Sequence, residues 1–138
     1  MSDDRFKDWK PPVIEHGKPT AYNWVVQYPE GLTLGSHTDI GAFTYINARH
    51  GVTLGDEVQI GSHCSIYSVS TIDDKRGPVT LGRNARVGAH SVIMPGVTIG
   101  ENAVVGAMSF VNADIPPDTV ACGVPARVVR ENRPRPEN

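Results

Sequence analysis

A five-residue phrase recurs four times along the chain and constrains the fold more than any other feature. It reads Gly-Leu-Thr-Leu-Gly at 31–35, Gly-Val-Thr-Leu-Gly at 51–55, Pro-Val-Thr-Leu-Gly at 78–82 and Gly-Val-Thr-Ile-Gly at 96–100. From each phrase an aliphatic residue recurs every six positions, and the twelve residues are Leu34, Ile40, Ile46, Leu54, Ile60, Ile66, Leu81, Val87, Ile93, Ile99, Val105 and Val111. A fixed hexapeptide period predicts a parallel β-helix.

Two further positions of each hexapeptide support this interpretation. The residue after the aliphatic one is glycine in eight of the twelve hexapeptides, and the residue four positions after it is small or β-branched in most of them. We expect the aliphatic side chain to fill the interior, the glycine to tolerate a positive φ angle, and the small residue to fit beside a corner. Three hexapeptides then make one triangular coil of three short strands. The predicted fold is an all-β parallel β-helix of about four to five coils.

The spacing of the coils locates two insertions. The coils begin 20, 27 and 18 residues apart, and 18 residues make one unbroken coil. The first coil therefore carries two extra residues near 49–51, and the second carries nine, so we expect a loop at about 67–80 that leaves the prism. Such loops on a rigid scaffold commonly carry function. We interpret residues 1–138 as a single domain, with an N-terminal cap at 1–30, the β-helix at 31–125 and a C-terminal tail with a helical turn at 126–138.

Charge, hydropathy and cysteine content exclude several classes of function. A net charge of −2 and a pI near 6.2 give no indication of nucleic-acid binding. No apolar run approaches the roughly 18 residues of a transmembrane helix, and the first ten residues are too polar for a secretory signal peptide. Cys64 and Cys122 form neither a metal-type spacing nor a disulfide framework. We therefore expect a cytoplasmic protein without membrane insertion, bound nucleic acid or a required metal.

The motif [LIV]-G-x-x-[STAV]-x, together with the long stretch 95–130 that contains Asp-Ile-Pro-Pro and Gly-Val-Pro-Ala-Arg, resembles the hexapeptide-repeat acyltransferases. That family includes O- and N-acetyltransferases of sugars and of nucleotide-linked amino sugars. The resemblance covers roughly residues 34–130. It implies a left-handed β-helix, an exception to the usual right-handed crossover. It also implies a homotrimer that binds acetyl-CoA in the groove between neighbouring subunits.

One column of the expected coils contains histidines. The third position after the aliphatic residue of each coil's second strand reads Phe43, His63, His90 and Met108. Coils that stack in register would make His63 and His90 neighbours on one edge. Two adjacent imidazoles resist double protonation, and a neutral imidazole is what a general base requires. We predict a catalytic role for at least one of the pair, with an exposed corner that tolerates any polar residue as the alternative.

The resemblance also implies a path for acetyl-CoA. Contacts to the cofactor are expected, from the pantetheine arm to the adenine and phosphate end, at Ala89, Ala107, Asn112, Ala113, Arg127 and Arg130. Arginine suits phosphate oxygens because it forms charge-assisted hydrogen bonds. This direction places the thioester near Ser62 and His63. His63 is therefore the preferred base, with His90 as its partner or as a pantetheine contact.

Three positions depart from the family pattern. Galactoside-type enzymes place a catalytic histidine in the projecting loop, whereas residues 68–74 contain none. Ala113 replaces a usual lysine, and Met108 replaces a glycine. The missing loop histidine permits an amine acceptor, because a neutral amine needs less help from a base than a hydroxyl does. Asp73 and Asp74 in the loop either hold a sugar hydroxyl or amine, or form a solvated turn.

The expected function is transfer of an acetyl group from acetyl-CoA to an amine or hydroxyl of a sugar or nucleotide sugar, in cell-envelope polysaccharide biosynthesis. Two alternatives remain open. One is a zinc enzyme of the γ-type carbonic anhydrase kind, which needs three converging imidazoles; no two histidines here have that family's paired spacing. The other is a non-catalytic β-helical subunit.

Overall fold

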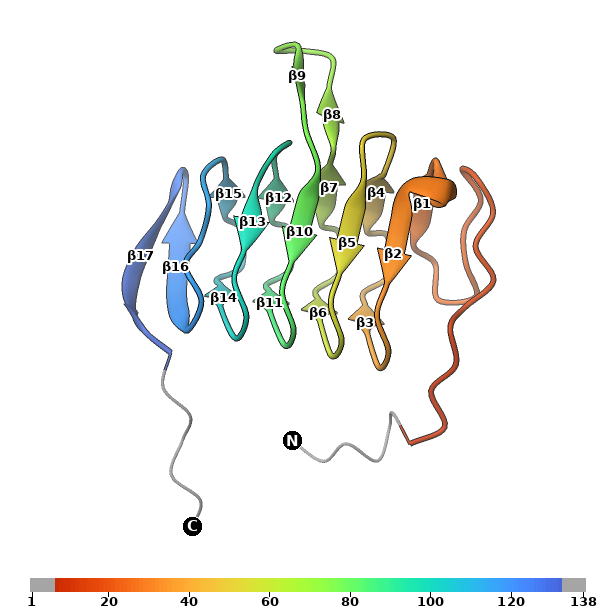
Figure 1. The fold of residues 1–138 in the computed structure, drawn as a ribbon, viewed down its shortest axis with the longest axis horizontal. Helices are drawn as coiled ribbons and strands as arrows, with labels where there is room; N and C mark the ends of the chain where they lie inside the picture. The colour runs from red at the N-terminus through yellow and green to blue at the C-terminus, as the bar shows by residue number, and fades with distance from the viewer. Residues whose placement is uncertain (1–6, 133–138) are drawn as a thin grey trace.

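The computed structural model describes residues 7–132, which wind into a prism of stacked coils with a sheet on each of its three sides (Figure 1). Sheet 1 contains, in spatial order, β1 (Val25–Gln27), β4 (Tyr45–Asn47), β7 (Ser65–Tyr67), β12 (Val92–Ile93) and β15 (Phe110–Val111). Sheet 2 contains β2 (Leu32–Leu34), β5 (Val52–Leu54), β10 (Val79–Leu81) and β13 (Thr98–Ile99). Sheet 3 contains β3 (Asp39–Ile40), β6 (Gln59–Ile60), β11 (Arg86–Val87), β14 (Val104–Val105), β16 (Thr119–Gly123) and β17 (Ala126–Glu131).

The hexapeptide period sets the register of all three sheets. Leu54 pairs with Leu34 on one side and with Leu81 on the other, although 20 and 27 residues separate them in sequence. The same aliphatic ladder runs through sheets 1 and 3. Every aliphatic residue of the period is buried except Leu34, which is half-buried in the first coil. The core is therefore a column of stacked aliphatic side chains, as the period predicts.

Small residues at the corner between sheets 3 and 1 serve as backbone links as well as packing. The Thr44 hydroxyl donates to the Gly61 carbonyl (2.9 Å), and the Ser91 hydroxyl donates to the Gly106 carbonyl (3.2 Å). Cys64 occupies the same slot in the second coil, and its thiol donates to the Gly88 carbonyl (3.2 Å). Burial raises the pKa of the Cys64 thiol. A hydroxyl or thiol at this position therefore forms a hydrogen bond from each coil to the next coil along the chain.

The N-terminal segment closes the open end of the prism. β1 pairs in parallel with β4, and Trp24, immediately before β1, is only 3% exposed. The Thr20 hydroxyl accepts hydrogen bonds from the backbone N–H groups of Tyr22 and Trp24 (3.2 and 3.4 Å). An atypical terminal unit of this kind is expected where a repeat core must end. The strand or cap predicted around 22–28 is confirmed.

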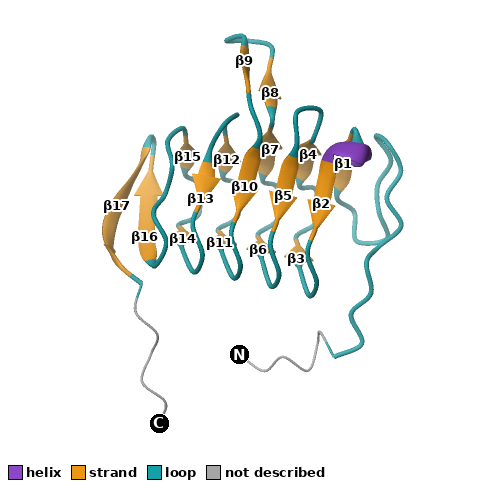
Figure 2. Cartoon of the chain, viewed as in Figure 1, coloured by secondary structure: helices purple, strands orange, loops and turns teal. Residues whose placement is uncertain are grey.

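Helical structure is almost absent from the described chain (Figure 2). It consists of one short 3₁₀ turn, η2 (Pro29–Gly31). None of the described residues form a helix long and apolar enough to cross a membrane. The predicted projecting loop is an antiparallel hairpin of β8 (Val69–Ser70) and β9 (Lys75–Arg76), which stands out from the prism between β7 and β10.

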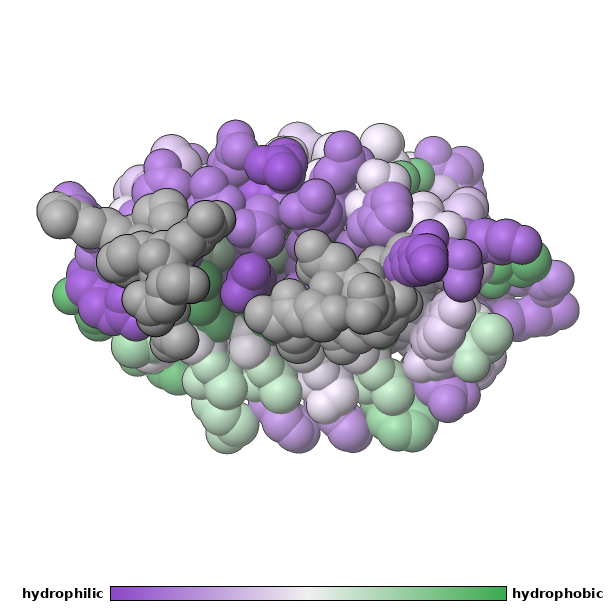
Figure 3. Space-filling view, turned by 90° about the horizontal axis from the view of Figure 1, so that it is seen from below, coloured by the Kyte–Doolittle hydropathy of each residue, from purple (hydrophilic) through white to green (hydrophobic). Residues whose placement is uncertain are grey.

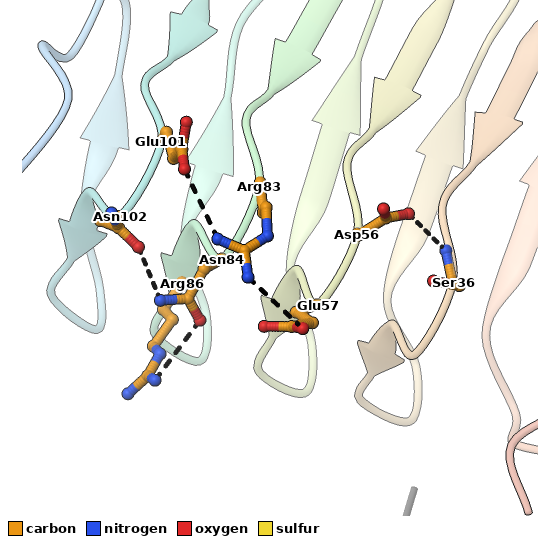
Figure 4. Close-up of polar contacts among 8 residues, drawn as sticks. All are labelled: Ser36, Asp56, Glu57, Arg83, Asn84, Arg86, Glu101 and Asn102. Atoms are coloured by element: carbon orange, nitrogen blue, oxygen red, sulfur yellow. Dashed lines mark hydrogen bonds and ion pairs between the residues drawn. The ribbon is translucent and has the colours of Figure 1, made fainter.

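A ladder of polar side chains lines the corner between sheets 2 and 3 (Figure 4). The Arg83 guanidinium lies between Glu57 (3.7 Å) and Glu101 (3.6 Å), and the Asn84 amide donates to the Asn102 side-chain oxygen (2.8 Å). These groups are largely exposed, so each ion pair adds little stability by itself. The corner is a solvated face whose charges are matched within the chain.

The helical turn predicted in the C-terminal tail is wrong for its described part. Residues 126–131 form β17, which turns back through Gly123 (φ 110°) and pairs antiparallel with β16. The reason is long-range, because without β17 the outer edge of β16 would present unpaired backbone groups. The β-branched Val128 and Val129 also favour a strand. Residues 133–138 lie outside the described residues, as do residues 1–6 of the predicted cap.

Candidate active site

The candidate site follows the corner between sheets 3 and 1. We call the column of Phe43, His63, His90 and Met108 the histidine edge. Each of these residues has a positive φ angle, between 58° and 66°. The corner between sheets 2 and 3 repeats this conformation at His37, Glu57, Asn84 and Asn102, with φ between 56° and 63°. The left-handed backbone is therefore a property of both turns, and the side chains alone distinguish the histidine edge.

The two predicted histidines are stacked on each other. The imidazole rings of His63 and His90 lie 4.8 Å apart between centroids, with an interplanar angle of 6°. The Phe43 ring packs against the other side of His63 at 5.1 Å. Both imidazoles are exposed, and neither ring makes a hydrogen bond to another described residue. The predicted adjacency is confirmed, and the ring nitrogens are available to a bound molecule.

The backbone beside the histidines has hydrogen-bonding capacity that the described chain does not use. The N–H groups of Ala89 and Ala107 donate to no acceptor within the described chain, whereas the neighbouring His90 and Met108 N–H groups donate to the coil before (3.0 and 2.9 Å). Successive coils pack closely at this corner, through the glycines that precede the alanines. A Cβ on Gly88 would lie 2.4 Å from the Ala107 nitrogen. Small side chains and free N–H groups thus form a shelf along the histidine edge.

The predicted phosphate contacts lie at the far end of sheet 3. Arg127 and Arg130 project from β17 and are exposed, and neither lies within 4.0 Å of a carboxylate of the described residues. β17 is four strands away from β6, or roughly 19 Å at about 4.8 Å per strand. An extended ligand that spans this distance would reach from the arginines to His63.

The remaining two predicted contacts are not brought to this edge. Asn112 and Ala113 follow β15, at the end of sheet 1 that lies away from the histidines. The resemblance from which they were taken describes a site between subunits, whereas the structure holds one chain. Within that chain His63, His90, Ala89 and Ala107 form one group, Arg127 and Arg130 a second, and Asn112 with Ala113 a third.

A pocket that the sequence reasoning missed lies over sheet 1 beside the hairpin. Its volume is about 660 Å³, and we call it the tyrosine pocket. Its walls include Tyr28, Tyr45, Tyr67, Arg49 and Asp73. Tyr45 directly precedes the interior residue Ile46, and Tyr67 directly follows Ile66 in the next coil. The outward-facing positions on either side of the aliphatic residue could therefore have indicated an aromatic surface. The pocket's other half comes from the insertion at residues 69–73, which no period describes.

Comparison with known proteins identifies the family. A model of the bacterial transferase hexapeptide (six repeats) matches residues 78–113. The structure of a hexapeptide-repeat containing acetyltransferase, VCA0836 from Vibrio cholerae, has 31% sequence identity and a TM-score of 0.75, and the match covers 80% of this chain and 68% of that one. The chain belongs to the hexapeptide-repeat acetyltransferase family. The family resemblance and the all-β, left-handed parallel β-helix that it implied are thereby confirmed.

Two further relatives of this hexapeptide-repeat protein bear on the acceptor. Galactoside O-acetyltransferase of Escherichia coli K12 is 40% identical over 121 residues, which cover 77% of this chain and 60% of the relative. The chain thus spans less than two thirds of that enzyme's length. A variant of the N-acyltransferase AntD from Bacillus cereus, in complex with dTDP-4-amino-4,6-dideoxyglucose and coenzyme A, has 26% identity and a TM-score of 0.59, and covers 82% of this chain and 72% of that one.

Proposed function

We propose that this hexapeptide-repeat protein transfers an acetyl group from acetyl-CoA to an amine or hydroxyl of a sugar or nucleotide sugar. The observation that carries the proposal is the stacked pair of His63 and His90 beside the N–H groups of Ala89 and Ala107, which donate to no acceptor among residues 7–132. A relative of similar fold, with 32% identity and a TM-score of 0.76, has been crystallised with acetyl coenzyme A. The galactoside and amino-sugar relatives support a sugar acceptor.

His63 is the proposed general base. Its imidazole takes the proton from the acceptor nitrogen or oxygen as that atom attacks the thioester carbonyl. The N–H group of Ala89, one coil from His63, is proposed to stabilise the negative charge that develops on the carbonyl oxygen, and the N–H group of Ala107, one coil further, is proposed to contact the pantetheine arm. When the C–S bond breaks, the imidazolium returns the proton to the leaving thiolate. His90 holds the His63 ring in place by stacking.

The outer parts of the acetyl-CoA molecule would be held by the C-terminal coils. Arg127 and Arg130 are proposed to bind its phosphates, because neither guanidinium pairs with a carboxylate of residues 7–132 and both can form charge-assisted hydrogen bonds. Asn112 and Ala113 are proposed to contact it from a neighbouring subunit. The proposed assembly is a homotrimer, which agrees with the exposed hydrophobic residues Phe43 (65%) and Met108 (67%) on the histidine edge.

Solution mass tests this assembly. Light scattering on the purified protein is expected to give about 45 kDa, three times the 14.9 kDa of one chain. A monomer mass would remove the neighbouring subunit from the proposed site. We further propose a cytoplasmic enzyme of cell-envelope polysaccharide biosynthesis, which deletion of the gene and analysis of surface sugars would test.

Thiol release tests the reaction itself. The protein is incubated with acetyl-CoA and a panel of amino sugars and nucleotide amino sugars, and free thiol is measured with a chromogenic disulfide. Turnover with at least one acceptor is expected. Absence of both thiol release and acetyl-CoA binding would refute the proposal in favour of a non-catalytic subunit. The zinc alternative has no support in the described residues, which contain no group of three potential metal ligands, and metal analysis of the purified protein tests it directly.

A further inference from the structure

The tyrosine pocket has the dimensions of a small-molecule site. Its volume of about 660 Å³ falls within the usual range for ligand pockets. It lies on the outer face of sheet 1, bounded by the hairpin insertion, and shares no lining residue with the histidine edge. Its lining combines three tyrosines with one arginine and one aspartate, so it offers flat aromatic surfaces and both signs of charge.

The aromatic walls are held in fixed orientations. Tyr45 and Tyr67 lie 5.7 Å apart between ring centroids, at an angle of 50°. The Tyr45 hydroxyl donates to the Gln27 side-chain oxygen (2.7 Å) and accepts from the Asn47 amide (3.3 Å). Rings that are already ordered lose little entropy when a ligand binds. A planar nucleobase stacks on such a surface whatever its hydrogen-bonding pattern.

Arg49 supplies an unneutralised positive charge at the rim. Its guanidinium carbon lies 5.6 Å from the centre of the Tyr28 ring, and no carboxylate of the described residues lies within 4.0 Å of it. Arg76 and Arg83, in contrast, pair with Asp74 and Glu57 (both 3.7 Å). A guanidinium over an aromatic ring, without an anionic partner, is suited to a phosphate.

Asp73 supplies the negative charge on the hairpin side. Its carboxylate lies 3.6 Å from the Lys75 ammonium. The Ser70 hydroxyl lowers the pKa of Asp73 most, and the backbone N–H of Asp73 itself and Lys75 lower it further, against a smaller opposing effect of desolvation. The carboxylate is therefore ionised at neutral pH and accepts hydrogen bonds, as required for contact with sugar hydroxyls.

The pocket and the histidine edge lie along the same strand. His63 precedes β7, and Ser65 and Tyr67 follow on its outer face, since alternate side chains of a strand share a face. The four residue steps from His63 to Tyr67 span at most about 13 Å. A ligand that is anchored in the pocket can therefore extend across Ser65 to the imidazoles.

We propose that the tyrosine pocket binds the nucleoside diphosphate part of a nucleotide-linked amino sugar whose amine is the acceptor. The base stacks on Tyr45 and Tyr67, the diphosphate meets Arg49, and Asp73 accepts hydrogen bonds from the ribose. This inference rests on the proposed function, because it assigns the acceptor of that reaction. Coenzyme A also contains a nucleoside diphosphate, so the test must separate donor from acceptor.

The probe is UDP, titrated calorimetrically into the protein without acetyl-CoA. We expect saturable binding that weakens at least about tenfold in Arg49→Gln and about 5- to 150-fold in Tyr67→Leu. Arg83→Gln is the matched control, since it removes an arginine from the corner between sheets 2 and 3, and it should bind UDP like the wild type. Binding should persist when the protein is saturated with coenzyme A. Absence of UDP binding, equal binding by all variants, or competitive displacement of UDP by coenzyme A would each overturn the assignment.

Failure of this assignment can be told apart from failure of the proposed reaction. UDP binding requires no turnover. If UDP binds in a way that depends on Arg49, but no acceptor gives thiol release, the assignment of the pocket stands and the acetyl transfer is refuted. Thiol release with plain amino sugars that is unchanged in Arg49→Gln, in a protein that does not bind UDP, would refute the pocket and leave the transfer standing. Circular dichroism of each variant confirms that the fold is retained.

Discussion

Replacing His63 and His90 by asparagine, one at a time, shows which of the two histidines is the general base. Both residues have positive φ angles (58° and 61°), which asparagine tolerates better than alanine, so the turn should be preserved. Asparagine cannot accept the acceptor's proton at neutral pH. If His63 is the base, His63→Asn should lower kcat by about 10²- to 10⁴-fold, the usual contribution of a general base.

His90→Asn should have a much smaller effect. The imidazole of His90 lies flat against that of His63 at 4.8 Å, and Phe43 supports the other side at 5.1 Å. Loss of one aromatic contact costs about 0.5–1.5 kcal/mol, which corresponds to about a 2- to 13-fold loss of kcat if all of it is felt at the transition state. The two variants should therefore differ in kcat by at least about one order of magnitude.

The assay is thiol release with the best acceptor, from which kcat and KM are obtained for each variant. Added imidazole should partly restore activity to His63→Asn, because the edge is exposed. His37→Asn is the matched control, since His37 has a similar φ angle (56°) at the corner between sheets 2 and 3. Near wild-type activity in both edge variants would refute histidine catalysis at this site.

Three further predictions concern stability. Ile66→Ala should lower the free energy of unfolding by about 2–5 kcal/mol, because Ile66 is fully buried (0% exposed); exposed Thr53→Ala should change it by less than about 0.5 kcal/mol, and equal urea midpoints would contradict the aliphatic core. Gly88→Ala should destabilise by about 3 kcal/mol because its Cβ would lie 2.4 Å from the Ala107 nitrogen, whereas a wild-type melting temperature would mean that the coils can separate there. Burial raises the pKa of the Cys64 thiol above its ordinary value of 9.0, so its contribution to stability is full below about pH 9 and is lost as the pH rises through the raised pKa. Cys64→Ala should therefore lose less stability than Cys122→Ala between about pH 7 and pH 11, two units on either side of the ordinary thiol pKa of 9.0, and equal losses by urea titration would contradict this.

The hexapeptide period predicted the register because the interior leaves little choice. A slip of one residue would turn an aliphatic side chain outward and a polar one inward. This explains why Leu54 and Leu81 pair despite the nine extra residues between them. The same register predicts that His63 lies against His90, because residues at equal positions in neighbouring coils are neighbours in space.

The C-terminal tail and the tyrosine pocket could not be predicted from the period, for different reasons. β17 forms because the edge of β16 is otherwise open, and this is a long-range condition that no local pattern contains. The pocket depends on outward-facing residues, which the core does not constrain, and on how the hairpin stands over them. The neighbours of an outward-facing tyrosine depend on where the inserted hairpin lies, and the hexapeptide period does not determine that position. Period-based reasoning is therefore strong for the interior and the corners, and weak where an insertion meets an outer face.

Two of the three corners of the prism differ in whether the chain satisfies their polar groups. They share the same left-handed turn conformation, so backbone geometry alone cannot make either one functional. At the polar corner the chain satisfies its own groups, since Arg83 pairs with Glu57 and Glu101 (3.7 and 3.6 Å). At the histidine edge the rings of His63 and His90 contact each other but make no hydrogen bond within the described chain. Hydrogen-bonding capacity that the fold leaves unused is available to a substrate, and this difference supports the site proposed on the histidine edge.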